Sequence, residues 1–313
     1  MDIREKVLEK LDDKGLEQYL QENGVDLEVI SESQREIASV PGDKEIYYDK
    51  TGKERENVLV STSNIKGINR CKDFTWFDLL NYGAAGAPRS VRENDNFNIN
   101  SLSFRFVLGW LEEKSLEEVK EMYKDTEQIE FKCFKNGDEK EYYLRGEGNH
   151  RVVVAKNIGV PEIIARSVIT YEYNPQKYTL YLSYEKQKER LKELVKELDL
   201  SWAKGSKGKD IIRFRFDRWH GILSVFSYRD DVLRHDFSKI DVMKEEVNSM
   251  IDRLEAIKRK ARMHYFIYKM FPGKARDLLK KFILPDIEDE GLSHVIPLLE
   301  VDRKRAYERD IKT

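Results

Sequence analysis

The most informative part of the chain lies in its middle, where residues Leu144 to Ile163 read LRGEGNHRVVVAKNIGVPEI. A strand-like run leads into this stretch. The apolar run after Arg151 has the length of a short helix and ends at Gly159, with Pro161 two residues further on. Ile163 to Tyr173 is again strand-like. The predicted order is therefore strand, tight turn, short helix, strand.

The predicted turn from strand to helix carries Gly146-Glu147-Gly148-Asn149-His150-Arg151. Glycines there let the backbone approach a ligand closely. The first N–H groups of a helix have no partner within it and favour anions. Arg151 can bind a phosphate through two hydrogen bonds, and His150 can donate or accept one. The turn is therefore predicted to hold phosphate.

A purely structural interpretation accounts for the same residues. Asn149 can cap the helix, Gly148 can permit the turn, and His150 and Arg151 can pair with local acids such as Glu147. Glycine-containing turns are common, so residue types alone leave both interpretations open.

The segment before the turn predicts two helices and a hairpin. Leu102 to Trp110 and Ser115 to Tyr123 have helical patterns, and Ser115 with Glu118 three residues later has the spacing of a capping box. Two strand-like runs, residues 129–134 and 141–144, flank an Asn-Gly turn, which predicts a β-hairpin.

Residues 115–173 resemble the nucleotide-binding core of the ParB/sulfiredoxin superfamily. In that superfamily a strand ends in a Gly-x-x-Arg or Gly-x-His-Arg box, and an alanine-containing helix, a glycine and a strand follow. The residues that match in place are Gly148, His150, Arg151, Ala155 and Gly159. The resemblance implies an α+β domain with a mixed sheet.

The resemblance also implies a set of ligand contacts. The triphosphate of ATP or CTP, accompanied by Mg²⁺, would lie on the turn, with Arg151 on the phosphates. Ala87-Pro88-Arg89 is similar to the family's Pro-Arg element, which makes Arg89 a further candidate. The nucleotide-binding residues expected are Gly146, Gly148, Asn149, His150, Arg151 and Arg89.

Glu147 is a candidate for chemistry beside the phosphates. Superfamily members with an Asp-Gly-x-His-Arg box, among them nucleases, regulators and a free-serine kinase, carry an acid where Glu147 stands. A carboxylate beside phosphate can hold Mg²⁺ or act as a base. Glu147 is therefore the expected metal ligand, and Glu147 and His150 are the expected catalytic residues.

Two departures from the family pattern limit the activities that the resemblance implies. Sulfiredoxins carry a catalytic cysteine between the glycine and the histidine, and Asn149 stands there in this chain. Chromosome-partitioning ParB proteins usually carry Gly-Glu-x-Arg and a downstream helix-turn-helix, which is not evident after Pro175. Thiol-dependent reduction and centromere clamping are not expected.

Charge divides the chain unevenly. The net charge of −2 consists of roughly −9 before residue 175 and roughly +7 after it. Lys and Arg are densest from Lys204 to Lys281, and aromatic residues such as Trp219 lie among them. This region predicts contact with DNA phosphates and stacked bases, and a solvated helix face is the alternative.

Three domains are predicted: a helical extension over residues 1–44, the nucleotide-binding domain over 45–175, and a basic C-terminal domain over 176–313. Within the second, residues 45–60 predict a hairpin ending near Ser61, and 64–100 an irregular loop or lid.

The basic C-terminal domain is expected to be mostly helical with one β-hairpin. Residues 185–198, 242–270 and 275–283 predict helices, residues 202–209 a loop, and 211–226 the hairpin.

The compartment expected is the cytoplasm. No apolar run reaches the ~20 residues needed to span a bilayer, and the start lacks the apolar core of a secretory signal. Cys71 and Cys133 are too few for a disulfide framework, and we interpret them as structural thiols.

Three functions follow as hypotheses. The first is a ParB-like nucleotide-binding protein that acts on or is regulated with DNA, as a nuclease or a nucleotide-dependent regulator. The second is a small-molecule phosphotransferase or phosphohydrolase that uses Glu147 and Arg151. The third is a protein-interaction module with a vestigial nucleotide site.

Overall fold

The computed structural model describes residues 2–68, 73–87, 101–125, 129–198, 200–204, 210–214, 222–226 and 230–270. The chain divides into two compact units, Met1–Pro175 and Gln176–Thr313. Helices and strands occur in both units, which confirms the α+β class.

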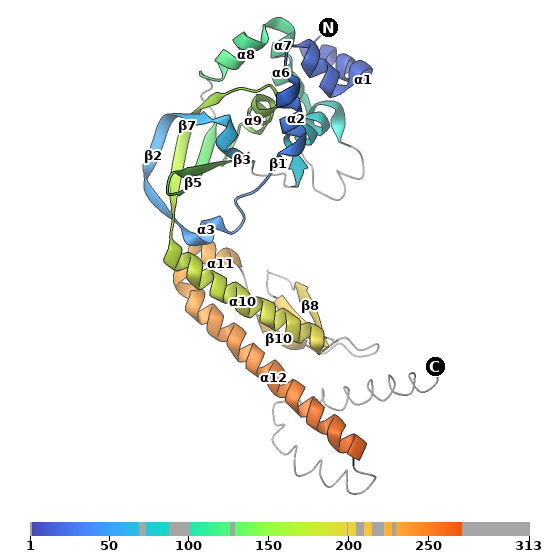
Figure 1. The fold of residues 1–313 in the computed structure, drawn as a ribbon, viewed down its shortest axis with the longest axis vertical. Coiled ribbons are helices and arrows are strands. Elements are labelled where there is room, and N and C mark those ends of the chain that lie inside the picture. The colour runs from blue at the N-terminus through green and yellow to red at the C-terminus, as the bar shows by residue number, and fades with distance from the viewer. Residues whose placement is uncertain are drawn as a thin grey trace, which may run out of the picture. The chain divides into compact units, whose positions relative to one another are not determined.

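The first unit is built on a five-stranded sheet with the strand order β2-β7-β5-β6-β3 (Figure 1). Its strands are β2 (Tyr48–Ser61), β3 (Ile65–Gly67), β5 (Glu130–Asn136), β6 (Glu139–Leu144) and β7 (Glu162–Tyr173). β7 pairs antiparallel with β2 and parallel with β5, while β6 pairs antiparallel with β5 and parallel with β3. The predicted mixed sheet is therefore present.

Helices cover one face of this sheet (Figure 1). The central one is α9 (Asn149–Asn157), which packs against α2 (Leu27–Arg35), α4 (Trp76–Asn81) and α6 (Ser101–Leu108). α1 (Ile3–Glu22) packs against α6, which α7 (Trp110–Glu113) and α8 (Leu116–Met122) follow. One hydrophobic core joins all these helices to the sheet, and Val152 to Ala155 of α9 are fully buried in it.

The other face of the sheet carries aromatic rings. Phe134 alternates with the core residues Phe131 and Cys133 along β5, so it points to the opposite face. Its ring stacks on that of Tyr171 at a centroid distance of 5.2 Å. α3 (Lys44–Tyr47) lies at the start of β2, and Lys44 pairs with Glu141 of β6.

The second unit combines two long helices with a small antiparallel sheet. The helices are α10 (Pro175–Glu197) and α12 (Ile240–Met270), and α11 (Asp230–His235) precedes α12. The sheet has the order β10-β9-β8, with β8 (Leu200–Lys204), β9 (Asp210–Phe214) and β10 (Ile222–Phe226). Met243, Val247, Met250 and Leu254 form the buried stripe of α12.

Several predicted elements are confirmed. Ser115 and Glu118 form the capping box at the start of α8, with both reciprocal bonds present. The β5–β6 hairpin, α9 and β7 follow in the predicted order, and the long helix near residues 242–270 is α12. β9 and β10 form the predicted antiparallel pair.

Three local predictions were wrong. Residues 45–60 form α3 and the single strand β2 instead of a hairpin, because β2 takes its partner from β7, more than a hundred residues away. The irregular segment 64–100 contains β3, β4 (Phe74–Thr75) and α4 among its described residues. Residues 202–204 belong to β8 instead of a loop. The predicted helix at residues 275–283 lies outside the described residues.

Other sequence expectations concern the cysteines and membranes. Cys133 is a buried free thiol in β5, and burial raises its pKa, whereas Cys71 lies outside the described residues. Among the helices described, none is both long and apolar enough to span a bilayer.

Candidate functional site

The predicted turn is held in place by the sheet and by one glycine. The backbone N–H of Arg145 donates to the carbonyl oxygen of Glu130 at 2.8 Å, which extends the β5–β6 pairing to the turn. Gly148 has a φ of 112°, and a Cβ there would lie 3.1 Å from Cγ1 of Ile129. The positive φ therefore favours glycine at residue 148, and a Cβ there would also crowd the side chain of Ile129.

The start of α9 has no side-chain cap. Gly148 occupies the N-cap position, and the first helical bond runs from the N–H of Val152 to the carbonyl oxygen of Gly148 at 3.0 Å. The N–H groups of Asn149, His150 and Arg151 therefore have no partner within the helix. This end of α9 can receive an anion.

The rest of α9 is fixed in the core. Nδ2 of the buried Asn157 donates to the carbonyl oxygens of Trp76 at 2.9 Å and Val153 at 2.8 Å. Lys156 forms an ion pair with Glu36 of 2.6 Å. These contacts fix the direction of the helix and so the position of its first turn.

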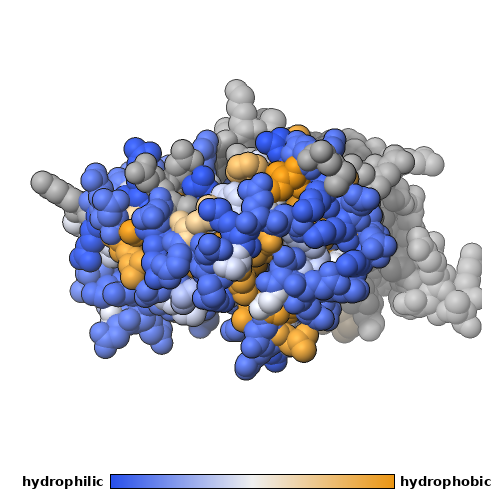
Figure 2. Space-filling model, turned by 90° about the horizontal axis from the view of Figure 1, so that it is seen from above, coloured by the Kyte–Doolittle hydropathy of each residue, from blue (hydrophilic) through white to orange (hydrophobic). Residues whose placement is uncertain are grey.

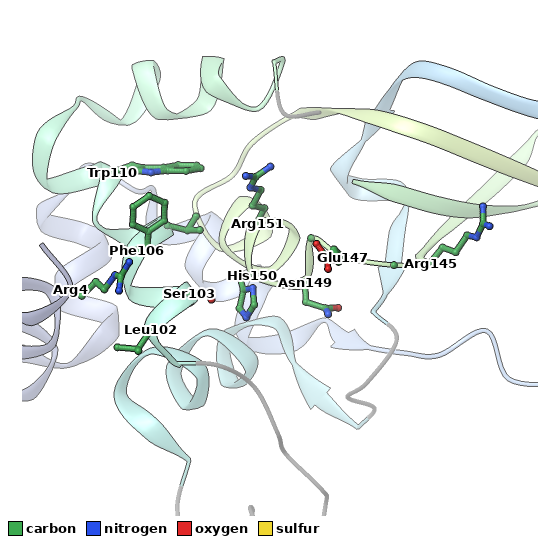
Figure 3. A pocket seen from close by; sticks show the side chains of 13 residues that line it. Arg4, Leu102, Ser103, Phe106, Trp110, Arg145, Glu147, Asn149, His150 and Arg151 are labelled. Carbon is green, nitrogen blue, oxygen red and sulfur yellow. The ribbon is translucent and has the colours of Figure 1, made fainter. Parts of the chain in front are cut away.

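A cavity of about 830 Å³ lies in front of this turn (Figure 3). Residues 145–151 form one side of it, and α1, α6 and α7 form the other. The residues from the helices are Arg4, Leu102, Ser103, Phe106, Val107 and Trp110.

Two arginines of this cavity have no acidic partner within the described residues. Arg151 is half-buried in the first turn of α9 and lies close to the hydroxyl of Tyr123, while Arg4 comes from α1. Arg145 differs from both, because its Nη1 pairs with Oε1 of Glu54 at 3.1 Å. Two arginines are thus available to an anionic ligand.

His150 faces a buried aromatic ring. Its ring centroid lies 4.8 Å from that of Phe104, at an interplanar angle of 84°. Phe104 in turn packs against Gly83, where a Cβ would lie only 2.6 Å from the Phe104 ring. Burial lowers the pKa of His150, so the imidazole is neutral near pH 7 in the free protein.

The far wall of the cavity is aromatic. The rings of Phe106 and Trp110 lie 6.1 Å apart, and Phe106 remains 46% exposed. The surface seen in Figure 2 is mainly hydrophilic with small hydrophobic patches, so an exposed ring lining a cavity is a notable feature. A planar ring of a ligand can stack on such a wall.

The structure brings nearly all the predicted site residues to this cavity: Gly146, Glu147, Gly148, Asn149, His150 and Arg151. Arg89 lies outside the described residues. The structural alternative holds in part: Gly148 permits the turn, but Gly148 and not Asn149 is the cap, and Oδ1 of Asn149 is buried without a hydrogen-bond partner. Gly146 is not sterically required, since a Cβ would make only ordinary contacts.

Acidic side chains are scarce here. Glu147 is exposed and is the one carboxylate among the described residues that line the cavity. Nowhere in the described ranges do three or more His, Cys, Asp or Glu side chains gather in a way that could hold a metal ion. Glu147 could therefore supply one ligand to a metal brought by phosphates, but not a metal site of its own.

The sequence did not single out Arg4, Phe106 or Trp110. A signal for the aromatic wall was present, because Leu102, Phe106 and Trp110 follow one another at intervals of four residues, which places them on one helical face. For Arg4 there was none, since its place at the cavity depends on how α1 packs against α6.

Comparison of the chain with protein-family models, with curated proteins and with solved structures gives no match. Its function is therefore inferred from the cavity itself. An uncapped helix start, two available arginines and an aromatic wall together suit a ligand with phosphate at one end and a planar ring at the other.

Proposed function

We propose that the cavity of the first unit binds a nucleoside triphosphate, ATP or CTP, with its phosphates at the start of α9. One observation carries this proposal: the free N–H groups of Asn149 and His150 and the available guanidinium of Arg151 line the same cavity. A polyphosphate can satisfy all of them together.

The size and the walls of the cavity support a nucleotide over a simple anion. Its volume of about 830 Å³ lies within the range usual for small-molecule sites. The base would stack on Phe106 or Trp110, while the phosphates stay at α9. The resemblance of residues 115–173 to the ParB/sulfiredoxin superfamily points to the same class of ligand.

Magnesium would enter with the triphosphate. Mg²⁺ is usually held by one or two carboxylates together with substrate phosphates, and it keeps several waters. Glu147 is suitably placed to be that single carboxylate, because it stands two residues before the start of α9.

The test is a calorimetric titration of ATP and CTP, with Mg²⁺, into three proteins. Arg151→Ala should weaken binding by about a hundredfold, the effect of losing a charge-assisted pair of hydrogen bonds. Arg166→Ala is the matched control, because Arg166 is an exposed arginine of β7 outside the cavity. No binding to the wild type, or equal affinity for all three, would contradict the proposal.

A second candidate is turnover of the bound nucleotide by a phosphotransferase or phosphohydrolase. Glu147 lines the cavity as a carboxylate and could act as a base, with His150 as a neutral imidazole beside it. Phosphate release that is lost in Glu147→Gln, while nucleotide affinity persists, would support this candidate. Unchanged phosphate release in Glu147→Gln would show that Glu147 takes no part in the reaction.

Nucleic acid is the proposed partner of the second unit. The support is the excess of Lys and Arg between Lys204 and Lys281, most of whose side chains lie outside the described residues. Lys258 of this region pairs with Glu197, so not every charge there is available. DNA affinity should fall steeply with salt, and a salt-independent affinity would contradict contact with phosphates.

A further inference from the structure

The N-terminal helix α1 reaches the cavity through a close contact with the junction of α6 and α7. Gly109 separates these two helices, and a Cβ at Gly109 would lie 2.8 Å from Cγ1 of Ile3. The absence of a side chain at residue 109 therefore lets the first turn of α1 rest on the segment that carries Phe106 and Trp110. Arg4, the next residue of α1, comes to line the cavity.

Ion pairs fix α1 in this position. Lys6 and Lys10 both contact Oε2 of Glu112, at 3.1 Å and 2.7 Å, and the Glu112 side chain is only 3% exposed. The hydroxyl of Tyr19 donates to the carbonyl oxygen of Leu108 at 3.3 Å. The place of Arg4 is thus set by its neighbours on α1 and does not depend on its own charge.

Arg4 itself is left with unused donors. Its guanidinium carbon lies 5.6 Å from the centroid of the Phe106 ring, and its Nε–H is buried without a hydrogen-bond partner. Lys6 and Lys10 have an acidic partner, whereas Arg4 has none among the described residues. Because the buried Nε–H is out of a ligand's reach, the donors that Arg4 can offer to a ligand's acceptors are those of its two terminal NH2 groups.

The two arginines enter the cavity from different sides. Arg4 comes from α1 beside Phe106, and Arg151 comes from α9 (Figure 3). With the phosphates at the start of α9, a base on the aromatic wall would have Arg4 as a neighbour, because Arg4 lies over the ring of Phe106. This step rests on the proposed function.

We propose that Arg4 determines which base the cavity accepts. A guanidinium has five N–H donors in a planar fork and no acceptor. Guanine offers the adjacent acceptors O6 and N7, and cytosine offers O2 and N3, so either can take two parallel hydrogen bonds. Adenine places its N6 amino donor next to each of its acceptors N1 and N7. Of the two nucleotides of the proposed function, Arg4 therefore selects CTP against ATP, and it would accept the guanine of GTP as well.

Calorimetric titration of GTP, CTP, ATP and UTP into wild type, Arg4→Ala, Arg4→Lys and the control Arg166→Ala tests this proposal. GTP, CTP or both should bind the wild type at least about tenfold more tightly than ATP. Arg4→Ala should lower the affinity for the preferred base to that for ATP and leave ATP within about twofold. Arg4→Lys keeps the charge without the planar fork, so it should lose the preference as well.

The outcomes separate the two proposals, and thermal melting confirms that each variant is folded. Absence of binding by all four nucleotides would overturn both. Binding without any preference against ATP, or an equal loss for every nucleotide in Arg4→Ala, would overturn only base reading by Arg4. An equal loss would place Arg4 on the phosphates.

Discussion

Two cations of α9, Arg151 and Lys156, stand five residues apart in opposite circumstances. Lys156 is buried, with a side chain only 8% exposed, and its Nζ lies 2.6 Å from Glu36 and 5.2 Å from the Trp76 ring centroid. Arg151 is half-buried at the cavity and has no acidic partner within the described residues. The charge of Lys156 is paired within the fold, whereas the proposed function assigns that of Arg151 to a ligand.

On this one helix, Lys156 should therefore matter for stability and Arg151 for binding. Removing the partner of a buried charge leaves that charge unpaired in the interior and costs much of the free energy of unfolding. Removing a half-exposed charge that has no acidic partner costs little stability, because no ion pair of the folded protein is lost. Breaking the ion pair of Lys156 should therefore lower the free energy of unfolding, whereas removing Arg151 should leave it nearly unchanged.

The largest expected effect on stability is that of Glu36→Ala. It should lower the free energy of unfolding by about 2–3 kcal/mol, because Lys156 would remain buried without its partner. Arg151→Ala should change it by less than about 0.5 kcal/mol. Urea denaturation followed by circular dichroism measures both changes. An equal loss of stability in the two variants would contradict the difference drawn between Lys156 and Arg151.

Much of the fold around α9 could be predicted because its signals are local. The Asn-Gly turn, the Ser115–Glu118 box and the Gly159–Pro161 stop each act within a few residues. The course of β2 could not, because residues 45–60 resemble a hairpin in isolation and find their partner only when β7 has formed. The placement of such a strand is a tertiary effect.

The next effect concerns the glycine that opens the helix. Gly148→Ala forces a residue with a Cβ into the left-handed region and against Ile129, and should lower the free energy of unfolding by about 1–2 kcal/mol. Gly146→Ala is the control, because Gly146 does not have positive φ and a Cβ there makes only ordinary contacts. Chemical denaturation should therefore separate the two glycines, and an equal effect would contradict the geometry of the turn.

The pH dependence of binding tests the histidine beside Arg151. Burial lowers the pKa of His150, so the free protein holds it neutral near pH 7. A bound phosphate favours the imidazolium and raises this pKa in the complex. His150 therefore takes up a proton on binding, and affinity should increase by about three- to tenfold as pH falls from about 8 to about 6.

Calorimetry of the wild type and of His150→Gln over this pH range measures that proton uptake. Titration of the nucleotide's own phosphate is common to both proteins, so only the difference reports on His150. Identical pH profiles would show that the phosphates do not contact the imidazole.

The smallest effect should come from the paired arginine of the cavity. Glu54→Gln removes one negative charge and frees Arg145, whose side chain points away from Arg151 (Figure 3), so any gain in positive charge acts on the phosphates only from a distance. Nucleotide affinity should rise by about two- to threefold at low salt and approach the wild-type value at high salt, because exposed charges are screened. A loss of affinity in the same titration would mean that Glu54 orients Arg145 for the ligand.

The candidate site could be predicted only as far as it is continuous in sequence. Residues 146–151 lie together on the turn, and their glycine, imidazole and guanidinium groups allowed a phosphate site to be predicted, with a purely structural role as the alternative. Arg4 and the aromatic wall are brought there by Gly109 and by the ion pairs of Glu112. Nothing in the local sequence near Arg4 indicates that contact.

The most direct measurement of the central claim is an amide NMR titration of the isotope-labelled protein with a nucleoside triphosphate and Mg²⁺, repeated with inorganic tripolyphosphate. Both ligands should shift the amide signals of Asn149, His150 and Arg151 most strongly. The nucleotide, but not tripolyphosphate, should also shift the indole N–H signal of Trp110. Phosphate binding without any shift at the start of α9 would contradict the claim that this helix end is the phosphate site.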